Sequence, residues 1–295
     1  MILVPVVAGT VLSVVLLLTL VDVDTARDRI ELLKTGLAIG AGTGGVAALV
    51  LAGRRQWSTE QSLVDVRHDA GERRITDLYS KAADQLGSDK AAVRLAGLYS
   101  LERLAQDTPP LRQTIVNVLC AYLRMPTVVD DQEPEVRRTA QVILRLHLRA
   151  HRPDFFWPDI DLDLTRAVLD QFDLSNVVLR RGQFGGAEFV GWTTFKDTRF
   201  ERFANFGGAR FRGSVNFGSV CFGNSAGFMG AHFEGPVQFD HATFLGPARF
   251  GGVRAQGTED VPDGAVFAAN ASFTGAEFSQ PPMFDHVKAN FPFPT

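Results

Sequence analysis

The chain has 295 residues, of which 45% are hydrophobic and 21% are charged, and its formal net charge at pH 7 is −3. This length predicts more than one domain, and the near-neutral charge excludes a globally basic protein that binds nucleic acid. The two cysteines, Cys120 and Cys221, lie far apart, which excludes a disulfide framework and favours a reducing compartment.

The first element is an apolar run over residues 2–21. Only Thr10, Ser13 and Thr19 interrupt it, and its length matches the roughly 20 residues that span a bilayer core. A cleaved secretory signal is the alternative. The absence of a basic segment before the run, the length of the run and the lack of a small-x-small cleavage site argue against it. The run therefore predicts a transmembrane helix.

A second apolar run covers residues 35–53. Within it, Gly36, Gly40 and Gly44 share one helix face, which lets another membrane helix approach closely and allows self-association. A loosely packed, glycine-rich soluble helix is the alternative, but the two arginines that follow the run resemble a cytoplasmic stop. We therefore expect residues 1–55 to form a transmembrane α-hairpin in the cell membrane, with the rest of the chain cytoplasmic.

Residues 56–152 show the three-and-four spacing of apolar residues that is typical of amphipathic helices. We expect four helices: over 75–86, over 90–106 with Ser88 as the N-cap, after Thr108-Pro109-Pro110, and from Glu133 onward. Two segments, beginning at Ala92 and at Glu135, resemble helices of HEAT-type repeats. This block is therefore expected to be a small α-helical, HEAT-like domain.

Phenylalanine recurs at a fixed interval in the following region, with steps that alternate between five and six residues. It occupies Phe184, Phe189, Phe195, Phe200, Phe206, Phe211, Phe217, Phe222, Phe228, Phe233, Phe239, Phe244 and Phe250. A small or β-branched residue precedes nearly every phenylalanine by two positions, as Ala187 precedes Phe189. Residues two apart in an extended segment point to the same side, so this pair faces inward and the mostly polar residue between them faces outward.

A glycine or polar residue follows most of these phenylalanines, which permits a bend after each short extended segment. One such unit cannot bury its apolar pair alone, so successive coils must stack and share a core. The pattern therefore predicts a β-solenoid with an interior filled by phenylalanine.

This pattern resembles the pentapeptide repeats, whose unit is a small residue, any residue, Leu or Phe, and two more. The preceding segment fits best, because Leu164, Leu169, Leu174 and Leu179 are five residues apart. The resemblance implies a right-handed, quadrilateral β-helix with four units per coil over residues 153–295. The alternating sixth residue departs from the family pattern and predicts coils of about 22 residues.

A coil of that length predicts columns of stacked rings, one of which joins Phe184, Phe206, Phe228 and Phe250. Two further columns join Phe189, Phe211 and Phe233, and Phe195, Phe217 and Phe239. The same offset places Glu188 beneath Arg210, for which we expect an exposed ion pair. Residues 252–263 are expected to protrude as a loop before the repeat resumes in phase at Phe267, and the proline-rich end should cover the last coil or fray.

The order of the whole chain, an apolar hairpin followed by helices and then by repeats, resembles membrane-associated pentapeptide-repeat proteins of actinobacterial type. This resemblance implies no established activity.

No catalytic, cofactor or metal site is expected. His147 and His151 lie one helical turn apart, but no clear third ligand accompanies them. The pairs Asp240-His241 and Asp285-His286 have no serine or cysteine nucleophile in a recognisable position. The glycines of the second apolar run lack the Lys-Ser/Thr ending of a phosphate loop. Cys221 occupies an outward slot and is expected to be reachable, with its redox role open, whereas Cys120 lies on an apolar helix stripe.

These features favour a membrane-anchored interaction scaffold, not an enzyme, whose solenoid presents an elongated face to an unidentified protein partner. The alternative is DNA mimicry, by which some pentapeptide-repeat proteins occupy topoisomerases, and it requires a strongly acidic rod. Residues 184–250 contain five acidic and six basic residues, which disfavours mimicry, and no nucleic-acid partner is expected. An enzyme within the helical block is a third possibility, but no constellation of residues supports it.

Overall fold

The computed structural model describes Val15, Thr19 and residues 71–126, 131–251 and 264–289. It divides into two compact units, Met1–Arg74 and Ile75–Thr295. The predicted membrane helices lie outside the described residues apart from Val15 and Thr19, which are helical. Within the part of the chain that is described, no helix has the length and apolar composition needed to cross a membrane.

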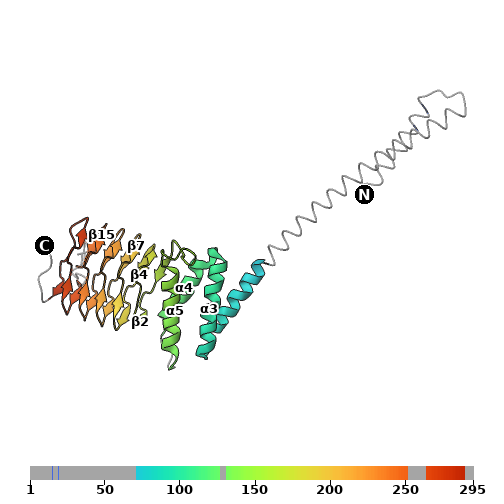
Figure 1. Ribbon diagram of the computed structural model, residues 1–295, viewed down its shortest axis with the longest axis horizontal. Helices are drawn as coiled ribbons and strands as arrows, with labels where there is room; N and C mark the ends of the chain where they lie inside the picture. Colours follow the sequence, from blue (N-terminus) through green and yellow to red (C-terminus); the bar gives the residue numbers. More distant parts are fainter. Residues whose placement is uncertain (1–14, 16–18, 20–70, 127–130, 252–263, 290–295) are drawn as a thin grey trace, which may run out of the picture. The chain divides into compact units, whose positions relative to one another are not determined.

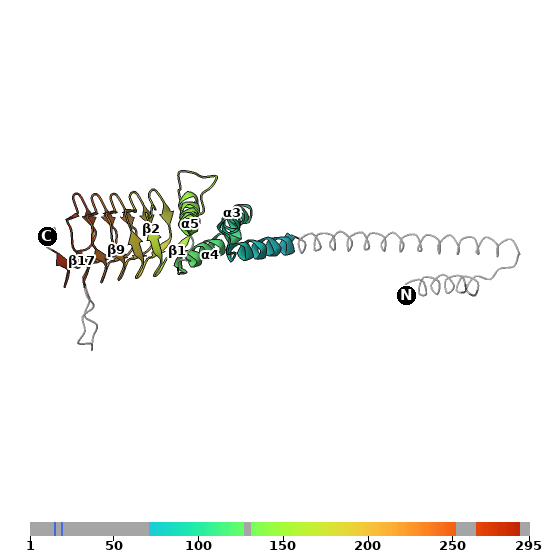
Figure 2. The ribbon, with the colours of Figure 1, turned by 90° about the horizontal axis from the view of Figure 1, so that it is seen from below.

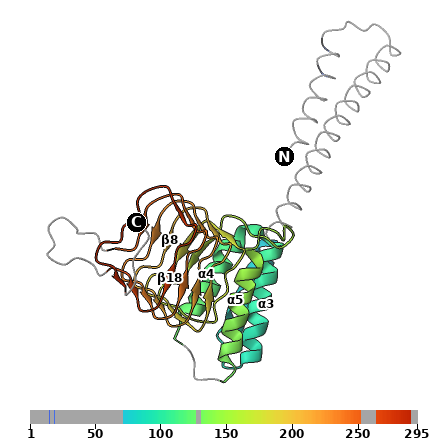
Figure 3. The ribbon, with the colours of Figure 1, turned by 60° about the vertical axis from the view of Figure 1, so that its left-hand side comes forward.

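The second unit begins with a helical block. Residues 75–86 are helical and are followed by α3 (Ala91–Asp107), α4 (Arg112–Arg124) and α5 (Glu133–His147), with a short 3-10 turn at Pro109–Leu111 before α4. α3 lies beside α5, and α4 packs against both (Figures 1 and 3). α3, α4 and α5 confirm the expected helices, with ends shifted by a residue or two, and their apolar stripes are buried as the spacing predicts. The first helix is also confirmed, but Leu78 on it is 46% exposed.

Two expected helix caps are wrong. Thr108 precedes the 3-10 turn and makes no side-chain cap, and Leu111 is the N-cap of α4. Lys90, not Ser88, is the N-cap of α3, and no side chain caps that helix. The hydroxyl of Ser88 instead accepts a hydrogen bond from the Lys90 amide at 3.2 Å, because it lies in the turn just before the helix. α5 starts as expected, with Pro134 in its first turn, where the missing N–H costs nothing.

The remaining described residues form a β-solenoid with four parallel sheets, one along each side (Figures 1 and 2). Sheet A contains β1 (Asp161–Asp163), β4 (Arg181–Gln183), β8 (Ala204–Asn205), β12 (Ala226–Gly227) and β16 (Ala248–Arg249). Sheet B contains β2 (Val168–Asp170), β5 (Glu188–Val190), β9 (Arg210–Phe211), β13 (His232–Phe233), β17 (Val266–Phe267) and β20 (Lys288–Ala289). Sheet C contains β6 (Thr193–Thr194), β10 (Val215–Asn216), β14 (Val237–Gln238) and β18 (Ala271–Ser272). Sheet D contains β3 (Val178–Leu179), β7 (Arg199–Phe200), β11 (Cys221–Phe222), β15 (Thr243–Phe244) and β19 (Glu277–Phe278).

The coil length grows along the solenoid. Leu162 pairs with Gly182, an offset of 20 residues, and Val178 pairs with Arg199, an offset of 21. Gly182 then pairs with Ala204, and the offset stays at 22 through the phenylalanine repeat. The leucine segment therefore follows the five-residue pattern, and the predicted longer coil is confirmed where the phenylalanines begin.

Two kinds of corner explain why five and six residues alternate. In the five-residue steps, the second residue after the phenylalanine has a positive φ, as at Gly186 (65°) and Asp197 (57°), which turns the chain tightly. In several six-residue steps, a glycine two positions after the phenylalanine lies against the previous coil. An ideal Cβ on Gly213 would be 2.1 Å from the carbonyl oxygen of Gly191, so only glycine fits at this position.

Stacked phenylalanine rings fill the interior, and the predicted columns are confirmed. The ring centroids of Phe184, Phe206, Phe228 and Phe250 are 4.9, 5.0 and 4.7 Å apart. The other predicted columns have spacings of 4.5 and 4.9 Å (Phe189, Phe211, Phe233) and of 4.9 and 4.8 Å (Phe195, Phe217, Phe239). All of these rings are buried. Their spacing equals the distance between neighbouring strands, so each ring lies directly on the one beneath it.

The repeat resumes in phase after residues 252–263, as predicted. Phe267 stacks on Phe233 at 4.9 Å, and Phe273 stacks on Phe239 at 4.9 Å. The expected loop itself and the end of the chain, residues 290–295, lie outside the described residues.

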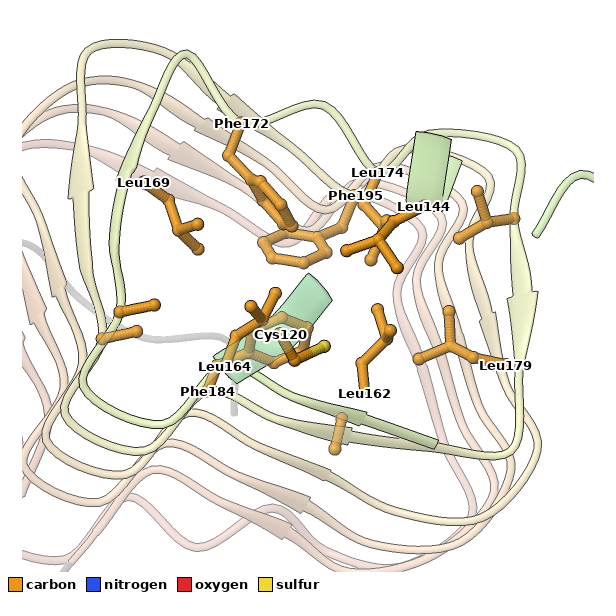
Figure 4. Packing of buried hydrophobic residues seen from close by; sticks show 14 of the residues in the cluster. Cys120, Leu144, Leu162, Leu164, Leu169, Phe172, Leu174, Leu179, Phe184 and Phe195 are labelled. Carbon is orange, nitrogen blue, oxygen red and sulfur yellow. The ribbon is translucent and has the colours of Figure 1, made fainter. Parts of the chain in front are cut away.

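α4 and α5 cover the first coil and close one end of the core. Figure 4 shows Cys120 of α4 and Leu144 of α5 among the leucines and phenylalanines of the first coils. The helices also share hydrogen bonds with the coil: Arg137 donates to the Val168 carbonyl at 3.1 Å, and the Val178 amide donates to the Leu148 carbonyl at 2.8 Å. The helical block and the solenoid thus share one hydrophobic core.

Candidate interaction surfaces and cavity

A cavity of about 770 Å³ opens in the helical block. It lies where residues 75–86 end and α3 begins, beside α4, and its wall is mostly apolar. The lining residues are Ala83, Leu86, Gly87, Ser88, Asp89, Arg94, Val118, Ala121, Tyr122 and Met125. Its volume falls within the range of small-molecule sites, which are apolar clefts with a few polar groups. The sequence did not indicate this cavity, because its walls come from three separate helices.

A buried polar network lies beside the cavity, centred on Glu133 of α5. The hydroxyl of Tyr122 donates to the Glu133 carboxylate at 2.8 Å, and Arg94 Nη2 lies 3.1 Å from the same oxygen. Arg137 lies 3.8 Å from the other carboxylate oxygen and donates to the Met125 carbonyl at 3.2 Å.

Burial, together with the Glu133 hydrogen bond, raises the pKa of Tyr122 to about 12. The hydroxyl therefore keeps its proton and acts as a donor. A buried carboxylate with this many donors is satisfied, and the network joins α3, α4 and α5. This geometry is that of a structural link between the helices. The Glu133 carboxylate is engaged by Tyr122 and two arginines, which disfavours a role for it as a base.

His147 and His151, considered as a metal-binding pair, have different surroundings. His147 is 1% exposed; its Nε2 lies 2.7 Å from Glu102 Oε1, its Nδ1 lies 2.7 Å from the Phe155 carbonyl oxygen, and its ring stacks on Trp157. His151 is exposed in the turn after α5. Across the described ranges, no group of three or more His, Cys, Asp or Glu side chains could hold a metal ion.

The two Asp-His pairs lie at solenoid corners, as the sequence predicts. His241 and His286 have φ values of 57° and 60°, so each occupies the turning position of its corner. Asp240 accepts hydrogen bonds from the Thr274 amide at 3.0 Å and from the Ser272 hydroxyl. Asp240 therefore joins its coil to the next one.

The two cysteines are both free and differ in exposure, as predicted. Cys120 is buried, and burial raises the pKa of its thiol to about 12. Cys221 is part-exposed on sheet D, with its sulfur 3.7 Å from Arg199 Nη1.

Sheet B presents a charged face of the solenoid, and its ion pairs differ from the predicted one. Glu188 does lie beside Arg210 in register, but its carboxylate contacts Arg212 at 2.5 Å. Arg210 instead lies 3.9 Å from Glu234 in the next coil. Residues two apart on a strand point the same way, so a long arginine can reach diagonally to the neighbouring coil. The predicted Glu188–Arg210 pair is therefore wrong, although the register behind it is confirmed.

Sheet C presents a contrasting, uncharged face. Its outward column consists of Thr194, Asn216, Gln238 and Ser272. The oxygen of Asn216 accepts a hydrogen bond from the Gly218 amide at 2.7 Å, which stabilises the following corner. The sides of the solenoid therefore differ in chemistry although they share one backbone pattern.

The comparisons agree with this geometry. Residues 222–259 match the family model described as pentapeptide repeats (9 copies). No curated protein and no solved structure matched the chain. The match covers the later part of the phenylalanine repeat, from Phe222 to Phe250, and the residues that follow it. The match and the coil geometry together support pentapeptide repeats in the solenoid.

Proposed function

We propose that the protein is a membrane-anchored interaction scaffold without catalytic activity of its own. The observation that carries the proposal is the solenoid interior, which fully buried side chains fill from the first coil to Phe250. Because the interior is filled with side chains, it offers no space for a ligand, and the solenoid is left to act through its outer faces. Solenoids of this kind offer elongated, repetitive surfaces to partners.

The polar groups within the described residues support a role without chemistry. The buried acid Glu133 is neutralised by arginines, and Asp240 is engaged in hydrogen bonds between coils. His147 lies between two acceptors inside the helical block. Each of these groups therefore has a structural task in the fold.

The anchoring part of the proposal rests on the sequence. Residues 2–21 and 35–53 are each long and apolar enough for a bilayer, which agrees with the resemblance to membrane-associated pentapeptide-repeat proteins of actinobacterial type. The arginines after the second run favour a cytoplasmic solenoid. Mimicry of DNA has less support, because sheet B mixes acidic residues with arginines instead of presenting an acidic face.

Two measurements on the full chain test this proposal. After alkaline carbonate extraction of membranes, the protein should stay in the membrane pellet, and protease added to intact cells should spare the solenoid. Recovery in the soluble fraction would contradict the anchor, and cleavage from outside would reverse the topology. Cross-linking from membranes should then capture partners that contact the outer faces of the solenoid or of the helical block.

A further inference from the structure

α5 lies across the beginning of the solenoid, and besides the Arg137 contact with Val168 it makes two side-chain contacts with the first coil. Arg138 Nη2 donates to Gln171 Oε1 at 2.9 Å, and Arg145 forms an ion pair with Asp173. Val142 lies between these arginines on the same helix face, and it is 44% exposed although it is apolar.

Trp192 lies at the same junction, on the next coil. Gly191 packs beside Gln171, since an ideal Cβ on Gly191 would be 3.5 Å from Gln171 Cγ, and Thr194 pairs with Asp173. Trp192 stands between Gly191 and Thr194, so the two contacts of α5 bracket it. Its side chain is 45% exposed.

The junction also gathers more positive charge, on Arg138, Arg145 and Arg149, than the two nearby carboxylates of Asp170 and Asp173 offset. Arg149 follows Arg145 by four residues. Burial lowers the pKa of Arg149, and repulsion from Arg145 and Arg152 lowers it further. Only Asp173 opposes this shift. Arg149 Nε is buried and has no hydrogen-bond partner among the described residues. An added anionic group would relieve this repulsion.

We propose that Arg138, Val142, Arg145, Arg149 and Trp192, the junction patch, bind an acidic segment of a partner protein that also carries apolar side chains. The proposal rests on the scaffold function and names the chemistry of its partner. Exposed tryptophan and arginine are the residues most enriched at the energetic centres of protein interfaces. Here they lie at one junction with an exposed aliphatic side chain, Val142, which suits a segment that alternates acidic and apolar residues.

A protein segment fits the junction patch better than a nucleic acid does. Nucleic acids require an extended basic surface that follows the phosphate backbone. The positive charge is local here, because the chain as a whole has a formal charge of −3 and the adjoining sheet B mixes both signs.

The test is a binding measurement on the full chain in detergent. The probe is a fluorescein-labelled peptide of alternating glutamate and leucine, and the comparison probes are a lysine–leucine peptide and a single-stranded oligonucleotide. Fluorescence anisotropy should show salt-sensitive binding of the glutamate–leucine peptide and weaker binding of both comparison probes. No binding of that peptide, or tighter binding of the oligonucleotide, would overturn the proposal.

Two variants locate the binding. Trp192→Ser should fold, because Ser214 occupies the matching position in the next coil, and Arg138→Glu changes an exposed side chain. Each should weaken peptide binding by about tenfold or more, as expected for central interface residues. Arg249→Glu makes the same charge change on an exposed residue of β16, away from the junction, and should leave binding within about twofold. Equal losses in Arg249→Glu and Arg138→Glu would show nonspecific attraction and refute the junction patch.

The outcome also separates this inference from the scaffold function. If membrane cross-linking captures the same partners with Trp192→Ser and Arg138→Glu as with the unchanged chain, the junction patch is wrong and the scaffold stands. If the unchanged chain leaves the membrane and captures no partner, the scaffold function fails, whatever the peptide does.

Discussion

Replacing Phe217 with alanine tests whether the stacked rings stabilise the solenoid. Phe217 is fully buried and lies between Phe195 at 4.9 Å and Phe239 at 4.8 Å, with Phe206 and Phe228 packed edge-on at 5.3 and 5.7 Å. Removing a buried phenylalanine ring leaves a cavity and costs about 3–5 kcal/mol of folding free energy. These ring contacts, together with those to Phe211 and Phe222, favour the upper half of that range, because each aromatic pair contributes roughly 0.5–1.5 kcal/mol beyond its buried area.

Guanidinium unfolding followed by far-ultraviolet circular dichroism measures this loss, in a chain that begins at Gln56 and omits the predicted membrane helices. Phe217→Leu keeps most of the volume and should cost less, about 1.5 kcal/mol. Phe284→Ala is the matched control, because Phe284 lies in the last described coil and is only partly buried. A loss for Phe217→Ala no greater than for Phe284→Ala would refute the view that the central ring columns carry the stability.

Two further predictions concern single sites. Gly213→Ala should destabilise the solenoid by about 1–3 kcal/mol through overpacking, because its Cβ would be 2.1 Å from the Gly191 carbonyl oxygen. Gly227→Ala, where the nearest atom would be 3.5 Å away, should be nearly neutral in the same unfolding measurement, and equal losses would contradict the close-packed corner. At mildly alkaline pH, iodoacetamide followed by peptide mass analysis should modify Cys221 in the folded chain and Cys120 only after unfolding. Burial raises the pKa of Cys120 from 9.0 to about 12, so as the pH rises the thiol loses its proton in the unfolded chain before it does so in the folded chain. The contribution of the neutral thiol to the folding free energy is therefore complete below pH 9.0 and is lost as the pH rises toward 12.

The repeat itself could be predicted because it depends on local geometry. Side chains two apart on an extended segment face the same way, so the alternating five- and six-residue steps already imply inward phenylalanines and a coil of 22 residues. The helices of the middle block followed from their apolar spacing for the same reason. The spacing of apolar residues shows which face of an element is buried, whichever element packs against that face.

Side-chain partners on the surface depended on the tertiary structure. The register placed Glu188 beside Arg210, yet Arg212 points to the same side and reaches the carboxylate instead. Arg210 on β9 and Arg212 just after it are both close enough to compete for the same carboxylate. Strand register alone therefore leaves the choice open, and the length and direction of each arginine settle it.

The junction patch shows the same limit at longer range. The sequence contains Arg138, Arg145 and Trp192, but nothing in their spacing brings them together. They meet because the first coil exposes an apolar end, which α4 and α5 cover with Cys120, Leu144 and their neighbours. Local periodicity thus determined which residues are buried in each element. Which surface residues became neighbours was decided by the tertiary structure, because α4 and α5 cover the apolar end of the first coil and so bring distant parts of the chain together.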